Sequence, residues 1–303
     1  MRAFTVIIVT LASFVIIFAV AFFFFEQHMA LRQYKKVVLG DRSNYLKLKN
    51  EFESYKKQSS GLKQVIVKSE GNNSKNVLVG NAINDSVNKI AGDVSVYYKN
   101  LTTGESVVVD GDKEYYMASL YKIILSLYML DLVKENKTQL DSPVGTKSAT
   151  LSEALEKIIT ESNNEYAVEL ADTYGWKNIE KAIEKKLNIN FNFDRSLAIK
   201  VKNVGVLLEN ITLSLRVSDN ESEYLLRLLR DQTRLSKLPK YLPASIYSHN
   251  KTGEFEEYSH DAGIFYTPKA NYILIFMSKT KDPSQTNEQM ALMSKDIYET
   301  LNK

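Results

Sequence analysis

The chain has 303 residues, of which 44% are hydrophobic and 25% are charged, and its formal net charge is +3. These proportions argue against a disordered chain, a collagen-like repeat or a protein with many membrane spans. The sequence contains no cysteine, which excludes disulfide bonds, thiol nucleophiles and cysteine-ligated metals. Its three histidines, His28, His249 and His260, have spacings that do not suit a metal site. We therefore expect no metal or other cofactor, and no nucleic-acid partner.

The N-terminal segment is long and apolar. No charged residue occurs between Ala3 and Phe25, and 23 residues of helix are long enough to cross a bilayer core of about 30 Å. Residues 1–25 are therefore predicted to be a transmembrane anchor or a signal, and the length of the apolar stretch favours the anchor. The positive charges after the span favour a cytoplasmic domain, whereas the chemistry described below requires an extracytoplasmic one. We expect a single-pass protein of the cell membrane with its catalytic domain outside the cytoplasm.

Two regions of different charge follow the anchor. Residues 26–79 contain 11 Lys or Arg against 5 Asp or Glu, which predicts a basic polar stalk. The stalk is expected to be a solvated, partly helical spacer or a segment that binds anionic lipid or wall polymer through its lysines. Residues 80–303 are long enough for one sizeable domain, and their sequence gives no indication of an oligomeric state.

Hydrophobic patterns in this domain predict strands near both ends and helices between them. A helix at 82–91 and strands at 94–98 and 106–109 are followed by a long apolar helix at 119–133. Further helices are expected at 152–160, 165–174, 176–187, 202–211 and 222–235, strands at 245–252, 262–267 and 272–278, and a last helix at 287–301. This order indicates an α+β fold, in which an antiparallel β-sheet is flanked by helices and contains an inserted all-helical half, with the N-terminal transmembrane helix ahead of it.

A serine and a lysine stand at the start of the most apolar predicted helix. Ser119 and Lys122 lie one turn apart on the same face of that helix. A lysine that is desolvated there loses its proton more readily and can act as a base toward the serine hydroxyl. The pair is a candidate nucleophile and activator, although five other serines in the chain also have a lysine three residues later.

Two more segments carry candidate polar groups. Ser162 and Asn164 stand at a junction between predicted helices, where they are able to relay a proton and bind a substrate amide or, alternatively, to cap a helix. Lys251, Thr252 and Gly253 lie on a predicted strand. There the lysine and threonine suit an anionic substrate group, and the glycine allows a ligand to approach the backbone.

In this order, the three motifs resemble the signature of class A β-lactamases and penicillin-binding proteins. Residues 80–303 are similar to the class A β-lactamase catalytic domain, including the segments 159–167 and 260–264. A literal Ser-Asp-Asn also occurs at 218–220, but it ends only 31 residues before Lys251, against 87 for Asn164. The family places a large helical segment in that interval, so we interpret Ser218 as a decoy.

The resemblance implies a role for each matching residue. Ser119 becomes acylated with Lys122 as its base, and Ser162 carries the proton to the departing nitrogen. The oxyanion hole is formed by the backbone N–H groups of Ser119 and Glu254. Asn164 binds the substrate side-chain amide, and the substrate carboxylate is held by Lys251 with Thr252.

The sequence departs from the family pattern in three places, one of which is Asn163 in place of the usual aspartate. The family hydrolyses its acyl-enzyme with a glutamate that lies on a loop after the second motif, but residues 193–200 contain no glutamate. Either Asp194 belongs to a shortened version of that loop, or the loop is deleted and Asp194 is a structural ion-pair partner; we favour the deletion. Glu254 is also unexpected, because it shares a strand face with Thr252 and is predicted to face the substrate carboxylate. Alternatively, it swings outward or pairs with a stalk lysine. His260 is predicted to lie at a strand edge, outside the site.

These observations predict a membrane-anchored serine hydrolase that forms an acyl-serine with β-lactams or with peptidoglycan stem peptides ending in D-Ala-D-Ala. Loss of the glutamate predicts slow release of the acyl group, since general-base assistance contributes a factor of about 10²–10⁴. The alternatives are a D,D-peptidase-like penicillin-binding protein and a catalytically inactive module that binds wall fragments.

Overall fold

The computed structural model describes residues 75–145, 149–194 and 196–303. The predicted anchor at 1–25 and residues 26–74 of the predicted stalk lie outside the described residues. Within the described ranges, no helix is both long enough and apolar enough to cross a bilayer.

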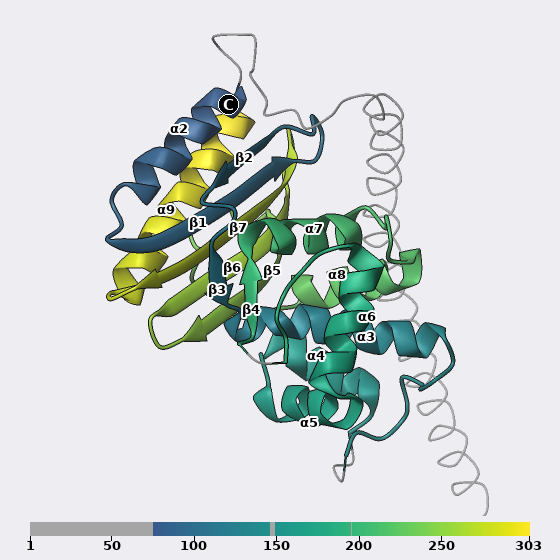
Figure 1. Cartoon of the computed structure of the whole chain (residues 1–303). Helices are drawn as coiled ribbons and strands as arrows, with labels where there is room; N and C mark the ends of the chain where they lie inside the picture. Colours follow the sequence, from purple (N-terminus) through teal and green to yellow (C-terminus); the bar gives the residue numbers. More distant parts are fainter. Residues whose placement is uncertain (1–74, 146–148, 195) are drawn as a thin grey trace, which may run out of the picture. The chain divides into compact units, whose positions relative to one another are not determined.

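The described chain contains a central antiparallel sheet with the strand order β2-β1-β7-β6-β5 (Figure 1). Strands from the two ends of the domain meet in its middle, where Val96 of β1 lies opposite Phe276 of β7. β5 pairs with β6 alone and so forms one edge of this sheet. The strands are β1 (Gly92–Asn100), β2 (Ser106–Val109), β5 (Tyr247–Phe255), β6 (Tyr258–Tyr266) and β7 (Asn271–Thr280).

Two helices from opposite ends of the described chain, α2 (Lys75–Val87) and α9 (Pro283–Asn302), lie side by side against the sheet (Figure 1). Val79 and Ile83 of α2, one turn apart, are fully buried in the core with Met290 of α9. Burial of such side chains stabilises a fold by about 1.5–3 kcal/mol each. The helix predicted at 82–91 therefore begins earlier than expected, because Val79 belongs to its buried face.

The segment between β1–β2 and β5 forms the other half of the molecule. It contains helices α3 (Tyr121–Lys134), α4 (Leu151–Thr160), α5 (Asn164–Tyr174), α6 (Trp176–Leu187), α7 (Val201–Thr212) and α8 (Asp219–Arg230). The prediction that this half is entirely helical was wrong, because β3 (Glu114–Tyr116) and β4 (Ala198–Lys200) form a second, two-stranded sheet. Three-residue strands are too short to show the alternation of apolar and polar residues by which strands are predicted.

α3 is the central helix of this half. Its side chains are buried around almost the whole helix, including Ile123 and Leu127, and it contacts α4, α5, α6 and α8. A helix that is apolar on all sides is stable only when it is surrounded by other elements. The 3₁₀ turn η1 (Ala118–Leu120) precedes α3 and contacts β5 and β6, so the start of α3 lies against the edge of the sheet.

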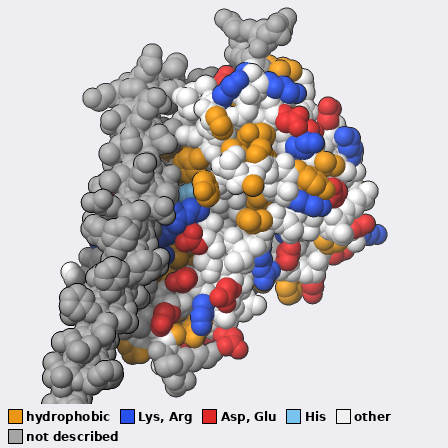
Figure 2. All heavy atoms as spheres, turned by 180° about the vertical axis from the view of Figure 1, so that it is seen from behind, with side chains coloured by type: hydrophobic (Ala, Val, Ile, Leu, Met, Phe, Trp, Pro, Cys, Tyr) orange, Lys and Arg blue, Asp and Glu red, His pale blue; other side chains and the backbone are white. Residues whose placement is uncertain are grey.

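The surface carries both signs of charge. On the face shown in Figure 2, the described part of the chain presents Lys and Arg side chains interspersed with Asp and Glu, and hydrophobic side chains gather in small groups between them. Such mixing favours solubility.

Candidate active site

Ser119 lies in the short 3₁₀ turn between β3 and α3. The preceding residue, Ala118, has a positive φ of 46°, which is unfavourable for a residue other than glycine. The turn is held in place by the N–H of Met117, which donates to the carbonyl of Leu197 at 2.6 Å. Strained backbone of this kind is often found at functional sites, where it fixes the direction of one side chain. The turn places Ser119 at the N-terminal end of the buried α3.

Lys122 lies one turn beyond Ser119, and its side chain is fully buried. Its ammonium donates to Ser119 Oγ at 3.2 Å, to Ser162 Oγ at 3.2 Å, to the carbonyl oxygen of Ser162 at 2.6 Å and to Asn164 Oδ1 at 2.6 Å. Burial and, to a smaller extent, the positive charge of Arg234 lower the pKa of Lys122 to about 8. The lowered pKa increases the fraction of Lys122 that is neutral near pH 7.

Ser162 lies in the turn between α4 and α5, and Asn164 is the first residue of α5. The backbone of Ser162 has a positive φ of 63°, so both segments that carry the candidate hydroxyls have a strained residue. Asn163 caps α5, because its side chain accepts from the N–H of Tyr166 at 3.0 Å. The helix cap is thus provided by the residue between them, and the polar groups of Ser162 and Asn164 are directed to Lys122.

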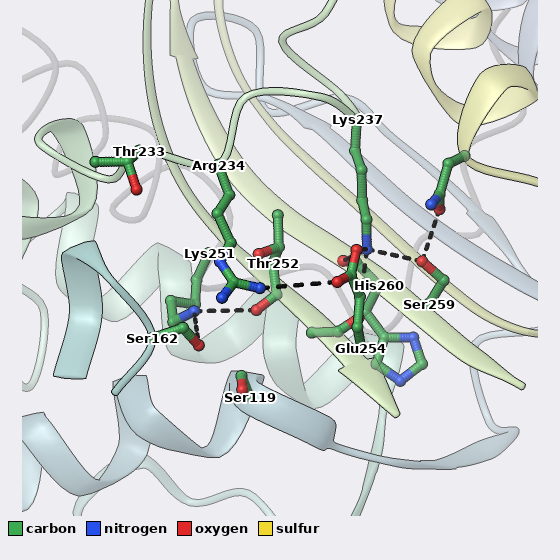
Figure 3. A network of polar contacts seen from close by, with 12 residues as sticks. Ser119, Ser162, Thr233, Arg234, Lys237, Lys251, Thr252, Glu254, Ser259 and His260 are labelled. Atoms are coloured by element: carbon green, nitrogen blue, oxygen red, sulfur yellow. Dashed lines mark hydrogen bonds and ion pairs between the residues drawn. The ribbon is translucent and has the colours of Figure 1, made fainter. Parts of the chain in front are cut away.

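Lys251 approaches the same hydroxyl from the sheet. Its ammonium donates to Ser162 Oγ at 2.9 Å and to the carbonyl of Thr252 at 3.1 Å (Figure 3). Burial has the largest effect on its pKa, followed by the positive charges of Lys122 and Arg234, and together they lower it to about 7. Ser162 therefore lies between two amines, and the structure brings together the residues of all three sequence motifs.

Gly253 has a role that the sequence did not show. A Cβ at this position would lie 3.1 Å from the carbonyl oxygen of Met117 and 3.3 Å from the Cβ of Ala118. The glycine therefore allows β5 to pack tightly against the turn that carries Ser119. This neighbour belongs to the protein itself, whereas the sequence had suggested close approach of a ligand.

Glu254 pairs with two cations that sequence analysis missed. Its carboxylate lies 3.0 Å from Lys237 Nζ and 3.7 Å from a guanidinium nitrogen of Arg234, and both residues come from the segment between α8 and β5 (Figure 3). Both partners belong to the same domain as Glu254, whereas the lysines at 26–74 of the predicted stalk lie outside the described residues, so pairing with one of them stays a prediction. No motif marks Lys237 or Arg234, because their positions depend on the path of an irregular segment.

The prediction that His260 lies at a strand edge was wrong. β6 is an interior strand, and His260 is fully buried within it. Its Nδ1 accepts from the N–H of Ser278 at 3.2 Å, and its Nε2 lies 2.8 Å from the carbonyl of Tyr116, so Nε2 carries the proton. Burial lowers the pKa of His260 to about 4, and the neutral ring links β6 and β7 to the strand before Ser119.

The segment expected to carry the deacylating glutamate is fixed by α6. The N–H groups of Phe193 and Asp194 donate to Glu180 Oε2 at 2.7 and 3.3 Å, and the Asp194 side chain is exposed. Among the described residues, Asp194 forms no ion pair. Within the same ranges, the hydrogen-bond partners of Ser119, Lys122 and Ser162 are amines, hydroxyls, an amide and a backbone carbonyl, and no carboxylate is among them.

The literal Ser-Asp-Asn at 218–220 lies at the start of α8. Ser218 is the N-cap of that helix and forms a capping box with Glu221. Its hydroxyl is engaged in a structural role, in agreement with its interpretation as a decoy.

An antiparallel sheet flanked by helices and a serine hydroxyl at hydrogen-bond distance from a buried lysine together define a β-lactamase-like serine hydrolase domain. Residues 78–301 match the model of the β-lactamase enzyme family. The chain belongs to this family. No curated protein sequence matches the chain significantly.

Several solved structures share the fold. A β-lactamase from Chitinophaga pinensis superposes with a TM-score of 0.68 at 20% sequence identity, covering 73% of this chain and 98% of that one. A class A β-lactamase from Mycobacterium abscessus gives 0.68 at 17% identity, covering 74% and 100% of the two chains. A mutant of PBP-A, described as an acyl-enzyme complex with penicillin G, gives 0.68 at 19% identity, covering 75% and 96%.

Proposed function

We propose that this protein forms an acyl-serine ester with β-lactams, or with peptidoglycan stem peptides ending in D-Ala-D-Ala, and releases the acyl group slowly. The observation that carries the proposal is the contact between Ser119 and Lys122. A buried amine with a lowered pKa lies 3.2 Å from a hydroxyl in a strained turn.

Acylation follows from this arrangement. The neutral amine of Lys122 takes the Ser119 proton while Oγ bonds to the carbonyl carbon of the substrate amide. The C–N bond then breaks, and the Ser162 hydroxyl gives its proton to the departing nitrogen. The Lys122 ammonium, 3.2 Å from Ser162 Oγ, returns a proton to Ser162 and becomes neutral again. The Lys251 ammonium, on the other side of Ser162, attracts the carboxylate of the substrate.

Deacylation is the slow step in this proposal. A water molecule that attacks the ester needs a base, and the described partners of Ser119 and Lys122 include no carboxylate. Loss of general-base assistance costs about 10²–10⁴ in rate. The fold similarity to a PBP-A mutant described as an acyl-enzyme complex with penicillin G supports the formation of an ester with a β-lactam.

We further propose that the predicted segment at 1–25 anchors the domain in the cell membrane, on the extracytoplasmic side. Peptidoglycan stem peptides are cross-linked there, which is the reason for this placement. Protease added to intact cells is expected to remove the domain, and complete protection would contradict the placement.

A fluorescent penicillin tests the acylation itself. The parent protein is expected to become covalently labelled and to keep the label for hours, whereas Ser119→Ala stays unlabelled. Loss of the label with release of the hydrolysed product would indicate an efficient β-lactamase. Release of D-alanine from a stem peptide would indicate a D,D-peptidase. Absence of label, with Ser119→Ala indistinguishable from the parent in every assay, would overturn the proposal in favour of an inactive module that binds wall fragments.

A further inference from the structure

Glu254 stands where the substrate is expected to meet the sheet edge. It lies on β5 two residues beyond Thr252, so the two side chains share a strand face. Its side chain is 50% exposed, whereas Lys251 and Thr252 beside it are buried. The carboxylate is therefore accessible from solvent and lies next to the residues proposed to hold the substrate carboxylate.

One partner of Glu254 is a buried ammonium group. Lys237 has a side chain only 1% exposed, and its Nζ donates to Ser259 Oγ at 2.7 Å and to the carbonyl of His260 at 3.1 Å. Burial lowers the pKa of Lys237, and the negative charges of Glu254 and Asp261 oppose this effect. Removing a countercharge from a buried ion is costly, so the Glu254 carboxylate is held on Lys237.

The other partner links Glu254 to the catalytic amines. The guanidinium of Arg234 lies 3.7 Å from the Glu254 carboxylate, and its charge contributes to the lowered pKa values of both Lys122 and Lys251. Arg234 is half exposed. Burial opposes ionisation of Glu254, but the charge and hydrogen bond of Lys237, then the charges of Arg234 and Lys251, hold the pKa of Glu254 below its usual value.

We propose that Glu254 is a specificity-determining residue. Its carboxylate competes with the carboxylate of the ligand for the cations at this edge of the sheet. The inference rests on the proposed function, because it concerns the ligand of the same site. An anionic ligand meets a carboxylate that already occupies Lys237 and Arg234. Either Glu254 stays and repels it, or Glu254 moves away and leaves Lys237 with less countercharge. Both routes weaken the binding of anionic ligands and leave the binding of ligands without that carboxylate unaffected.

The test compares benzylpenicillin with its uncharged methyl ester in a Ser119→Ala background, where no ester forms. Titration calorimetry gives the dissociation constant of each compound. Adding Glu254→Gln keeps the side-chain shape and removes the charge, and it is expected to tighten binding of benzylpenicillin about tenfold without changing that of the ester. The control is Glu257→Gln in the turn after β5, which removes an equal charge from an exposed side chain and is expected to change neither constant by more than about twofold.

Equal effects on the two compounds, an equal gain from Glu257→Gln, or no gain from Glu254→Gln would overturn the inference. If Glu254→Gln alone fails to fold, the double variant Lys237→Met/Glu254→Gln keeps the test decisive. The double variant contains no buried ammonium without a countercharge, because Lys237 is replaced as well. It is expected to keep a selective gain for benzylpenicillin of about threefold, since Arg234 is still released. Failure of the proposed function is seen separately, as absence of covalent label on the parent protein.

Discussion

Two polar clusters lie at the two ends of α3, and they differ in their countercharges. At the N-terminal end, Lys122 and Lys251 share Ser162 Oγ. Near the C-terminal end, Lys186 pairs with Asp131 and lies 2.9 Å from Glu221. Burial and the Glu221 hydrogen bond raise the pKa of Asp131, whereas hydrogen bonds from Asp131, Ser218 and Lys186 lower that of Glu221 in spite of its burial. The Asp131 carboxyl therefore gives up its proton less readily than the Glu221 carboxyl.

The comparison shows which surroundings make a lysine reactive. Lys186, which pairs with Asp131 and Glu221, links α6 to α3 and α8. An ammonium surrounded by hydroxyls, amides and another cation gives up its proton near neutral pH, as the lowered pKa values of Lys122 and Lys251 indicate. The clusters differ in burial as well as in neighbouring charge, because Lys122 and Lys251 are fully buried whereas the side chains of Lys186 and Asp131 are 14% and 21% exposed.

The largest expected effect is on the reactive side of this comparison. Lys122→Met retains the volume of the side chain but removes the base, so the acylation rate constant for a fluorescent penicillin is expected to fall by about 10²–10⁴. Stopped-flow labelling measures this rate. The matched control is Lys186→Met, whose folded fraction is expected to be labelled at the parent rate. Labelling of Lys122→Met at the parent rate would break the comparison.

On the structural side, Lys186→Met is expected to lower the free energy of unfolding by about 3–5 kcal/mol, because the buried carboxylate of Glu221 loses this countercharge. Urea denaturation followed by circular dichroism measures the change. Addition of Glu221→Gln removes the negative charge that has lost its lysine partner, and it is expected to restore part of the stability. A loss below about 1 kcal/mol would show that the ion pairs of Lys186 do not stabilise the fold.

The pH dependence of acylation sharpens the comparison further. Lys122 acts as a neutral amine with a pKa of about 8, so the rate is expected to rise about tenfold per pH unit below that value. Lys251 binds a carboxylate as a cation with a pKa of about 7, so the affinity for benzylpenicillin is expected to fall as pH rises through 7. The methyl ester lacks this second dependence, and its acylation is expected to have the higher pH optimum. Identical profiles for the two compounds would contradict this assignment of roles.

The smallest effect concerns backbone strain at Ser162. Both Ser162→Ala and Ser162→Gly remove the hydroxyl and are expected to impair acylation alike. Only glycine adopts the φ of 63° without strain, so Ser162→Gly is expected to be more stable than Ser162→Ala by about 1 kcal/mol. Thermal unfolding of the two variants measures this difference. Equal stabilities would show that the turn relaxes.

The sequence was sufficient to predict the groups whose relation is local or belongs to a known motif. Ser119 and Lys122 are three residues apart on one turn, and the order of the central elements follows hydrophobic periodicity. That Lys251 and Ser162 belong to the same site was predicted only from the family resemblance, because the two residues are far apart in the chain. Lys237 and Arg234 were missed since their positions depend on tertiary structure, and so was the pairing of β3 with β4.

Gly253 also sets how closely the edge strand β5 approaches the turn that carries the nucleophile. The carbonyl oxygen of Met117 would lie only 3.1 Å from any Cβ there, so the distance from the edge strand to the serine turn is fixed by main-chain atoms. Main-chain spacing does not change when side chains rotate. A single methyl group at this position would require the main chain of the serine turn to move away by a few tenths of an ångström.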